Sequence, residues 1–374
     1  MDVSIIVPLF RGEKFLPQIL VYIIQNYEYV NRYSKCDMEL ILVNDSPEWK
    51  IDAATVKTRE IPVYVIENSV NHGIHYSRIS GLQRATGKYI LFLDQDDTIE
   101  ENYIFSQLSK IGEADAIVCN GLYRGDRLIM ANEEAKRKVQ DNEYYFSSMR
   151  IIISPGQVLL SRESIPAEWG CYILKSNYCD DAFLWLLMKD RNAEFAINDK
   201  ILYHHNETGE NTSFCWKNNA MALQELYRMC EENHLLQKKH LDRLKETIDR
   251  RVEKHLLYAE LEELFRSAEA KKDVLNDYFV AKQCRRVAVY GYGVFGKKLV
   301  DLLKITCVEI PYVIDQNAET INVENLTIRT LQEELEAVDL IIVTTVWIYD
   351  SIRKELRKKV PCEIISMKQF LENI

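Results

Sequence analysis

The acidic tetrapeptide Asp94-Gln95-Asp96-Asp97 is the part of the sequence best suited to chemistry. It places three carboxylates within four residues, directly after the apolar segment Tyr89–Leu93. Carboxylates at this spacing repel one another, so a divalent cation or solvent must relieve the repulsion. The pattern therefore indicates a cation site. The competing interpretation is a solvated turn in which an aspartate caps the following helix.

A glycine-rich motif late in the chain is the second candidate. Gly291, Gly293 and Gly296 have the spacing that lets a backbone turn tightly and approach a diphosphate, and Asp315 follows at the position of a ribose-binding acid. The surrounding segment is too short for a complete dinucleotide-binding fold, and no redox residue set accompanies it. Three interpretations stay open: a structural or oligomerising module, a nucleotide or nucleotide-sugar sensor, and a dinucleotide site.

The elements that must position the acidic cluster alternate between strand and helix. The expected strands are Val3–Pro8, Met38–Val43, Ile61–Glu67 and Tyr89–Leu93, and the expected helices are Glu13–Tyr27 and Ser77–Ala85. This alternation predicts an α/β fold with a mostly parallel sheet flanked by helices and with ligands at the carboxyl ends of the strands. Asp45 and Asp94 both follow such strand ends.

Two changes of pattern divide the rest of the chain. Residues 214–283 are charged and favour helices without a glycine or proline, which predicts a connector of two or three amphipathic helices that could oligomerise. Residues 284–374 return to alternating elements and predict a small Rossmann-like α/β domain. Its expected strands are Val287–Tyr290, Ile310–Ile314, Leu340–Thr345 and Glu363–Ser366. The first domain is accordingly expected to span residues 1–213.

The bulk composition limits the classes of partner and compartment. A formal net charge of −10 argues against a nucleic-acid partner, because such proteins present a basic face to phosphates. The nine cysteines form no C-x-x-C pair and lie within apolar segments, so we expect reduced, buried thiols. No basic leader follows Met1 and no apolar run approaches the ~20 residues that span a bilayer, so we expect a cytoplasmic protein.

Several ordered blocks resemble family 2 glycosyltransferases, the inverting enzymes of the GT-A fold. Residues 7–16 are similar to the opening of that family, with a Val-Pro strand end, a nearby Glu and the later Gln25. Residues 41–46 resemble its second strand, which usually ends in two aspartates; Asn44 replaces the first of them. Residues 71–97 are similar to the family's most recognisable block, although Ile79 stands where Asn is usual.

The resemblance implies a role for individual residues. The implied donor contacts are Pro8, Phe10, Glu13, Asp45 (to the nucleobase), Asn71, Arg78, Asp94, Gln95 and Gln157. The implied metal ligands are Asp96, Asp94 and His205. For Arg78 a helix-surface salt bridge is the alternative, and Asp97 is expected to cap the next helix. Gly209, Asn211 and Ser213 resemble a polar loop over the donor.

Asp180-Asp181 stands where the family has a Glu-Asp pair whose second acid is the catalytic base. The resemblance therefore implies Asp181 as the base, with Asp180 in the place of the Glu. An alternative role for Asp181 is N-cap of the expected helix Ala182–Lys189. Helix dipoles lower the pKa of a carboxylate, whereas a base benefits from a pKa near neutrality. Burial must therefore raise the pKa of Asp181 if it is the base.

The implied activity is sugar transfer with inversion from a nucleotide-sugar, UDP-linked by expectation, to a hydroxyl acceptor in bacterial surface polysaccharide assembly. The implied cofactor is Mg²⁺ or Mn²⁺, and the implied acceptor is a glycan or lipid-linked glycan, with peripheral association at the inner membrane face open. A nucleotide-binding regulatory protein with a degenerate first domain is the alternative, supported by Asn44, Ile79 and Asp180. A nucleotidyltransferase would need a glycine- and arginine-rich N-terminal loop, which residues 9–14 do not provide.

Overall fold

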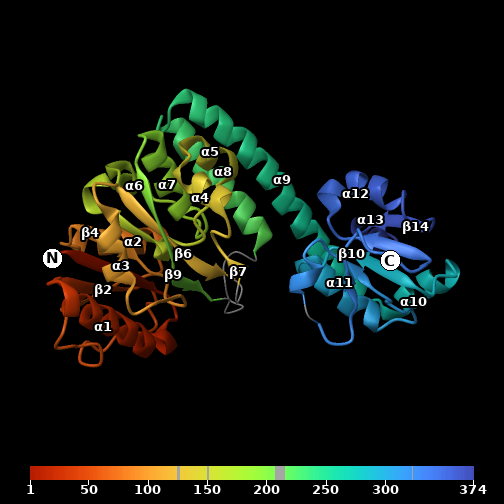
Figure 1. Ribbon diagram of the computed structural model, residues 1–374, viewed down its shortest axis with the longest axis horizontal. Coiled ribbons are helices and arrows are strands. Elements are labelled where there is room, and N and C mark those ends of the chain that lie inside the picture. The colour runs from red at the N-terminus through yellow and green to blue at the C-terminus, as the bar shows by residue number, and fades with distance from the viewer. Residues whose placement is uncertain (124–126, 150, 207–214, 322) are drawn as a thin grey trace. The chain divides into compact units, whose positions relative to one another are not determined.

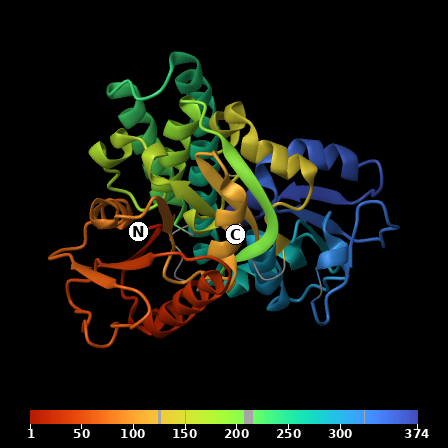
Figure 2. The same ribbon diagram turned by 60° about the vertical axis from the view of Figure 1, so that its left-hand side comes forward.

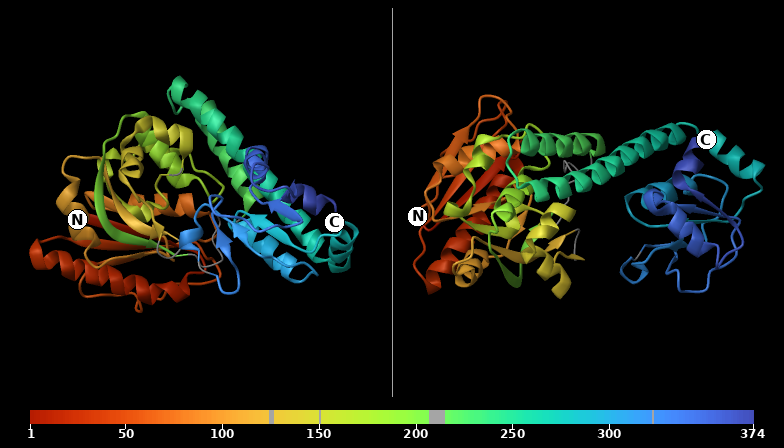
Figure 3. Two further views of the ribbon diagram at one scale, coloured as in Figure 1. Left: turned by 45° about the vertical axis from the view of Figure 1, so that its right-hand side comes forward. Right: turned by 90° about the horizontal axis from the view of Figure 1, so that it is seen from above.

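The computed structural model describes residues 1–123, 127–149, 151–206, 215–321 and 323–374. By packing, the chain forms two compact units, Met1–Glu253 and Lys254–Ile374, and each has its own sheet (Figure 1). The helical stretch expected as a separate connector is divided between the two units. Its long helix α9, Lys238–Glu269, is continuous (Figure 3).

The sheet of the first unit has the strand order β3-β2-β1-β4-β8-β6-β9-β5, and β7 pairs with β6. The strands are β1 Val3–Leu9, β2 Met38–Asn44, β3 Val63–Glu67, β4 Tyr89–Phe92, β5 Thr98–Ile99, β6 Ala116–Tyr123, β7 Arg127–Leu128, β8 Val158–Ser161 and β9 Phe195–His205. The first four strands in this order are parallel. Beyond β4 the sheet is mixed, because β8 runs antiparallel to both β4 and β6 while the long, curved β9 is parallel to β6 (Figure 2).

Both faces of this sheet are covered, which explains why β1 and β2 are buried along their whole length. Alternate side chains of β1 enter opposite cores: Ile5 packs with α1 and α3, and Ile6 packs with α2, α7 and α8. The helical segments are η1 Glu13–Phe15, α1 Leu16–Tyr33, α2 Ile74–Arg84, α3 Tyr103–Ile111, α4 Glu133–Gln140, α5 Asn142–Ser148, η2 Pro155–Gln157, η3 Arg162–Ser164, α6 Ala167–Cys171, α7 Asp180–Asp190 and α8 Trp216–Glu232.

The second unit is a doubly wound parallel sheet with the order β12-β11-β10-β13-β14. Its elements are α10 Lys272–Ala281, β10 Val287–Tyr290, α11 Val294–Lys304, β11 Val313–Ile314, η5 Ala318–Thr320, β12 Ile328–Arg329, β13 Leu340–Val343, η6 Val346–Ile348, α12 Tyr349–Leu356, β14 Glu363–Ser366 and α13 Met367–Glu372. Helices α10, α11 and α13 share a core with Val287 and Val289, whereas α12 packs on the other face, with Ala288. The Rossmann-like topology expected here is present, with β12 as an additional short strand.

Among the described residues, no helix is long and apolar enough to cross a membrane. All nine cysteines are free thiols, as expected. The expectation that they are buried is wrong for Cys171, Cys215 and Cys307, which are exposed. Cys171 ends the short helix α6 and Cys215 immediately precedes α8, so neither belongs to the apolar face of a long element.

Candidate active site

Strand pairing brings the acidic residues of the first unit to one edge of the sheet. β1 lies between β2 and β4, with Leu9 paired to Asn44 and Ile6 paired to Phe92. Asp45 therefore follows β2 and Asp94 follows β4 on either side of the end of β1. This is the edge where ligands bind in parallel sheets.

Arg78 links this edge to the helix that begins with the second acidic pair. Its guanidinium is 3% exposed and forms ion pairs with Asp94 through Nη2 and with Asp180 through Nη1. Burial disfavours the charged guanidinium, but the carboxylates of Asp180 and Asp94 outweigh burial and keep the pKa of Arg78 above its usual value. The helix-surface salt bridge considered for Arg78 is therefore wrong, because the bridge is internal.

Asp181 lies in the first turn of α7 and its pKa is raised to about 7. Burial is the main cause and the neighbouring charge of Asp180 adds to it, against the lowering effects of Arg78 and of the Ala182 amide. This amide donates to Asp181 Oδ1 over 2.7 Å. The alternative role of Asp181 as N-cap is wrong. The helix begins at Asp180, two residues before the expected Ala182, and Cys179 occupies the N-cap position. Burial therefore outweighs the lowering effect of the helix dipole on the pKa of Asp181, as its assignment as the base requires.

Asp94 and Asp96 differ in how far their carboxylates are occupied. Asp94 pairs with Arg78 through Oδ1 and accepts the hydroxyl of Ser154 at Oδ2 over 3.1 Å. Asp96 has no ion pair with any residue in the described part of the chain, and its pKa is raised to about 6 by burial and by the charges of Asp97 and Asp94. A bound cation would relieve this repulsion at Asp96.

Asp97 is buried and belongs to the contacts of β9. Its carboxylate accepts the Tyr203 hydroxyl and, at Oδ1, the Asn206 amide over 3.1 Å, and the same oxygen lies 3.2 Å from Nδ1 of His205. The expectation that Asp97 caps the next helix is wrong, because α3 begins at Tyr103 after the N-cap Asn102. Asp97 instead holds the acidic turn against β9.

His205, expected as a metal ligand, lies at the end of β9 beside Asp97 and stacks on Tyr123 at 5.2 Å between ring centroids. Burial opposes its protonation, but the hydrogen bond and charge of Asp97 leave the pKa of His205 raised. Within the described ranges, no group of three or more His, Cys, Asp or Glu side chains has an arrangement that could hold a metal on its own. A cation at Asp96 would therefore need further ligands from the substrate or from solvent.

Gln95 joins the acidic turn to the end of β1. Its Oε1 accepts the Phe10 amide over 2.9 Å and its Nε2 donates to the Phe10 carbonyl over 3.0 Å. A Cβ at Gly12 would overlap Gln95 Oε1, so the glycine permits this contact. The side-chain amide of Gln95 is thus bonded to the backbone of Phe10, a residue that is 42% exposed, and a contact of Gln95 with the nucleotide-sugar stays a prediction.

Three other residues were expected to contact the nucleotide-sugar donor, and their surroundings differ from one another. Gln157 is fully buried, accepting from the Ile153 amide over 2.7 Å and donating to the Cys119 carbonyl over 3.2 Å, and its contact with the nucleotide-sugar stays a prediction. Pro8 is buried within β1. Glu13 is exposed in η1, at the end of the strand where a ligand would approach.

Asp45 organises the loop that leads into α2. It is 3% exposed and accepts hydrogen bonds from the Asn68 side chain over 2.8 Å, the His72 amide over 2.9 Å and the Gly73 amide over 2.7 Å. Asn71 is exposed, and its Oδ1 also accepts the Gly73 amide, over 3.0 Å. Asp45 thereby orients the helix that contains Arg78, and its contact with a nucleobase stays a prediction.

Three residues that the sequence did not single out support the approach to α7. Buried His75 bonds the Trp169 carbonyl through Nε2 over 3.0 Å and accepts the Leu174 amide at Nδ1 over 3.0 Å. Trp169 donates to the Asp180 carbonyl over 2.8 Å. Glu225 of α8 accepts the amides of residues 175 and 176 over 2.7 and 3.2 Å. These partners lie far apart in sequence, so no local pattern signals them. The expected polar loop 209–213 lies outside the described residues.

The glycine-rich turn of the second unit has the geometry its spacing predicts. Gly291 has φ +91°, a Cβ at Gly296 would overlap the Gly291 carbonyl, and Gly293 faces open space. Asp315, however, accepts the amides of Tyr292 and Asn317 over 2.7 and 2.9 Å. Its carboxylate supports the turn itself, and a nucleotide at this turn stays a prediction.

Comparison with known proteins identifies the family. The family model described as Glycosyl transferase family 2 matches residues 4–162. Glycosyltransferase GlyA of Streptococcus pneumoniae is 31% identical over 127 residues, which are 32% of this chain and 16% of that protein. An uncharacterized glycosyltransferase of Haemophilus influenzae is 30% identical over 217 residues, 54% of this chain and 76% of that protein.

The fold agrees with these matches. The crystal structure of S. aureus TarS 1–349 in complex with UDP-GlcNAc has a TM-score of 0.52 and 18% identity, covering 74% of this chain and 81% of that one. The chain spans only 16% of GlyA, so the activity of that protein is not assigned to this chain. The sequence matches and the GT-A-like first unit together show that this chain belongs to glycosyl transferase family 2.

Proposed function

We propose that the chain transfers a sugar from a nucleotide-sugar, UDP-linked by preference, to a hydroxyl acceptor by a single displacement with inversion. Asp181 is the general base that takes the proton of the acceptor hydroxyl as its oxygen attacks the anomeric carbon. The product is a glycan or lipid-linked glycan of a bacterial surface polysaccharide. The nucleotide-sugar named with the TarS structure makes UDP-GlcNAc the first donor to test.

The observation that carries this proposal is the environment of Asp181. A general base works best with a pKa near the working pH, and burial beside Asp180 raises the pKa of Asp181 to about 7. Arg78 forms an ion pair with Asp180 and so balances the charge of that carboxylate. The carboxylate of Asp181 is then the one of the two that can accept a proton. Perturbed carboxylates of this kind are concentrated at functional sites.

A divalent cation fits the donor set at the acidic turn. Asp96 is the ligand we assign, with Asp94 beside it and His205 at the rim, because the Asp96 carboxylate forms no ion pair in the described residues and its pKa is raised by burial and by neighbouring negative charge. Carboxylate oxygens together with diphosphate oxygens suit Mg²⁺ or Mn²⁺. The cation would neutralise the charge that develops on the departing diphosphate.

Binding of the nucleoside is assigned to the residues around the ends of β1 and β2. Asp45, Asn71, Phe10 and Glu13 border this edge, and Asp45 retains about one of the four acceptor positions of a carboxylate beyond its three hydrogen bonds. Holding the nucleoside here would place the sugar toward Asp94 and Asp181.

The test is transfer across a panel of UDP-, GDP- and CMP-sugars with Mn²⁺ or Mg²⁺. We expect Asp181→Asn to lower kcat about 10²–10⁴-fold while donor affinity is retained. Glu163→Gln, an exposed acid of η3, is the matched control and should be fully active. Absence of binding for every donor, or full activity in Asp181→Asn, would overturn the proposal.

For the second unit we propose a structural or oligomerising role, with a nucleotide at the glycine-rich turn as the alternative. The engagement of Asp315 by backbone amides favours the structural role. Calorimetry of the full chain with NAD, for the wild type and for Gly293→Val, distinguishes the two roles. A heat of binding that Gly293→Val abolishes would show that a ligand binds at this turn.

A further inference from the structure

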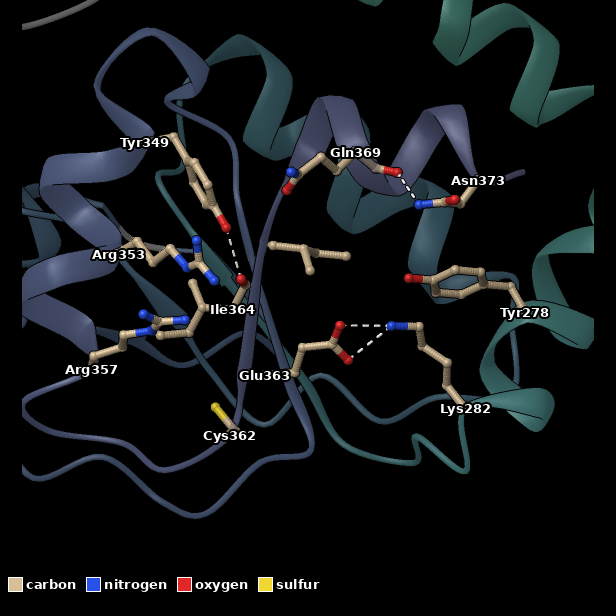
Figure 4. Close-up of a pocket in the computed structure, with 11 residues that line it drawn as sticks. Tyr278, Lys282, Tyr349, Arg353, Arg357, Cys362, Glu363, Ile364, Gln369 and Asn373 are labelled. Carbon is tan, nitrogen blue, oxygen red and sulfur yellow. Dashed lines mark hydrogen bonds and ion pairs between the residues drawn. The ribbon is translucent and has the colours of Figure 1, made fainter.

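A cavity in the second unit gathers basic side chains around the outermost strand. It has a volume of about 340 Å³ and is bordered by α10, α12, β14 and α13 (Figure 4). None of the glycines of the glycine-rich turn lines it. The cavity is therefore separate from that turn and from the acidic site of the first unit.

Two backbone groups of β14 at the sheet edge beside the cavity already have hydrogen-bond partners. The Tyr349 hydroxyl donates to the Ile364 carbonyl over 2.8 Å (Figure 4). The Ser366 amide donates to Gln369 Oε1 over 3.1 Å. An added strand would need these outward-facing groups. Side chains, and not the strand edge, must then determine what the cavity binds.

The charges around the cavity are unbalanced. Glu363 is paired with Lys282 at 2.7 and 2.9 Å, whereas Arg353 and Arg357 form no ion pair with any residue that the structure describes. Arg353 lies in the last turn of α12 and Arg357 is the C-cap four residues later, a spacing at which like charges repel each other. Arg353 Nε is also buried without a hydrogen bond to the described chain. Arg353 is half-buried and Arg357 is exposed, so an anion in the cavity would reach both guanidinium groups and would balance their charge.

The geometry points to a small phosphorylated ligand of the sugar-phosphate class. We propose that its phosphate binds between Arg353 and Arg357, because guanidinium groups match phosphate oxygens with paired, charge-assisted hydrogen bonds. Tyr278, Gln369 and Asn373 border the remaining space and offer a hydroxyl and two amides to the hydroxyls of a sugar. The volume is within the range of small-molecule sites.

Calorimetry of the full chain with glucose 1-phosphate and with inorganic phosphate tests the proposal. We expect saturable binding that weakens about tenfold or more in the double variant Arg353→Gln/Arg357→Gln. The matched control Lys354→Gln/Lys359→Gln removes the same charge from residues that do not line the cavity, and should bind like wild type. Binding that all three proteins share equally would overturn the proposal, because it would not depend on the arginines.

A phosphate could also belong to a lipid headgroup, so a parallel arm measures co-sedimentation with vesicles containing phosphatidylglycerol. Arginine-dependent binding of glucose 1-phosphate without vesicle binding identifies the soluble ligand. Arginine-dependent vesicle binding without binding of the soluble phosphates identifies the headgroup as the source of the same phosphate. Equal weakening in both double variants, or no binding in either arm, overturns the proposal.

Two further measurements exclude misfolding as the cause. Each double variant removes two positive charges from the end of α12 and the turn after it, so without ligand the arginine variant should melt close to the lysine control. Bound glucose 1-phosphate should slow the alkylation of Cys362, which lines the cavity, but not of exposed Cys307. Equal alkylation of Cys362 with and without saturating ligand would contradict a ligand in this cavity.

Discussion

The two units share a strand arrangement and differ in the side chains at the ends of their strands. β3-β2-β1-β4 and β12-β11-β10-β13 are both parallel, with the first strand of each unit in the interior of its sheet. In the first unit the strand ends lead to Asp94, Asp96 and a buried Arg78, whereas in the second unit Asp315 is satisfied by backbone amides. The shared strand arrangement therefore does not determine the chemistry. The chemistry depends on the polar groups that lie at this edge of each sheet.

The largest contrast should be in stability. Arg78→Met leaves Asp94 and Asp180 without their cation in a buried site, so we expect a loss of about 3–5 kcal/mol. Arg286→Met in the second unit removes an ion pair with Glu336 whose side chains are 34% and 49% exposed, and should cost about 0–1 kcal/mol. Urea unfolding followed by tryptophan fluorescence and circular dichroism measures both. Similar losses for the two variants would break the comparison.

Activity should depend on the acids of only one unit. Asp96→Ala, or removal of the cation with EDTA, should lower transfer about 10²–10³-fold, because the charge of the departing diphosphate is no longer balanced. Asp315→Ala should leave the transfer rate close to that of wild type. Donor turnover with and without added Mn²⁺ is the measurement. Persistence of full activity in EDTA would remove the cation from the proposal.

The glycine-rich turn should matter for folding more than for transfer. Gly296→Ala forces a Cβ against the Gly291 carbonyl, so we expect a loss of about 1–3 kcal/mol. Gly293→Ala is the matched control, since a Cβ there meets no atom within 4 Å. Thermal unfolding compares the two. A Gly293→Ala variant that is as unstable as Gly296→Ala would contradict the open space at Gly293.

The pH dependence of transfer should be the most gradual of these effects. Since burial raises the pKa of Asp181 to about 7, the base is protonated below that pH and becomes competent as the pH rises through it. We expect kcat/KM to fall about tenfold per pH unit below neutrality and to level off above it. The rates of transfer between pH 5 and 9 test this. A profile that is flat from pH 5 upward would exclude Asp181 as the titrating base.

Local patterns determined where the strands begin and which residue types come after them. β10 and β14 have the predicted bounds, and the ends of β2 and β4 lie within one residue of expectation, because apolar β-branched runs that end in polar turns are set by near neighbours. The acidic turn and the glycine-rich turn were visible for the same reason. The family resemblance extended this to Asp181.

Only the tertiary structure decided what these polar groups contact. Gln157 and Gln95, predicted as donor contacts, form hydrogen bonds with backbone groups, and Asp97 joins β9 in place of capping a helix. Arg78 reaches Asp180 across 102 positions of sequence. A buried polar group must find a partner, and the partner is chosen by packing between segments that no local pattern relates.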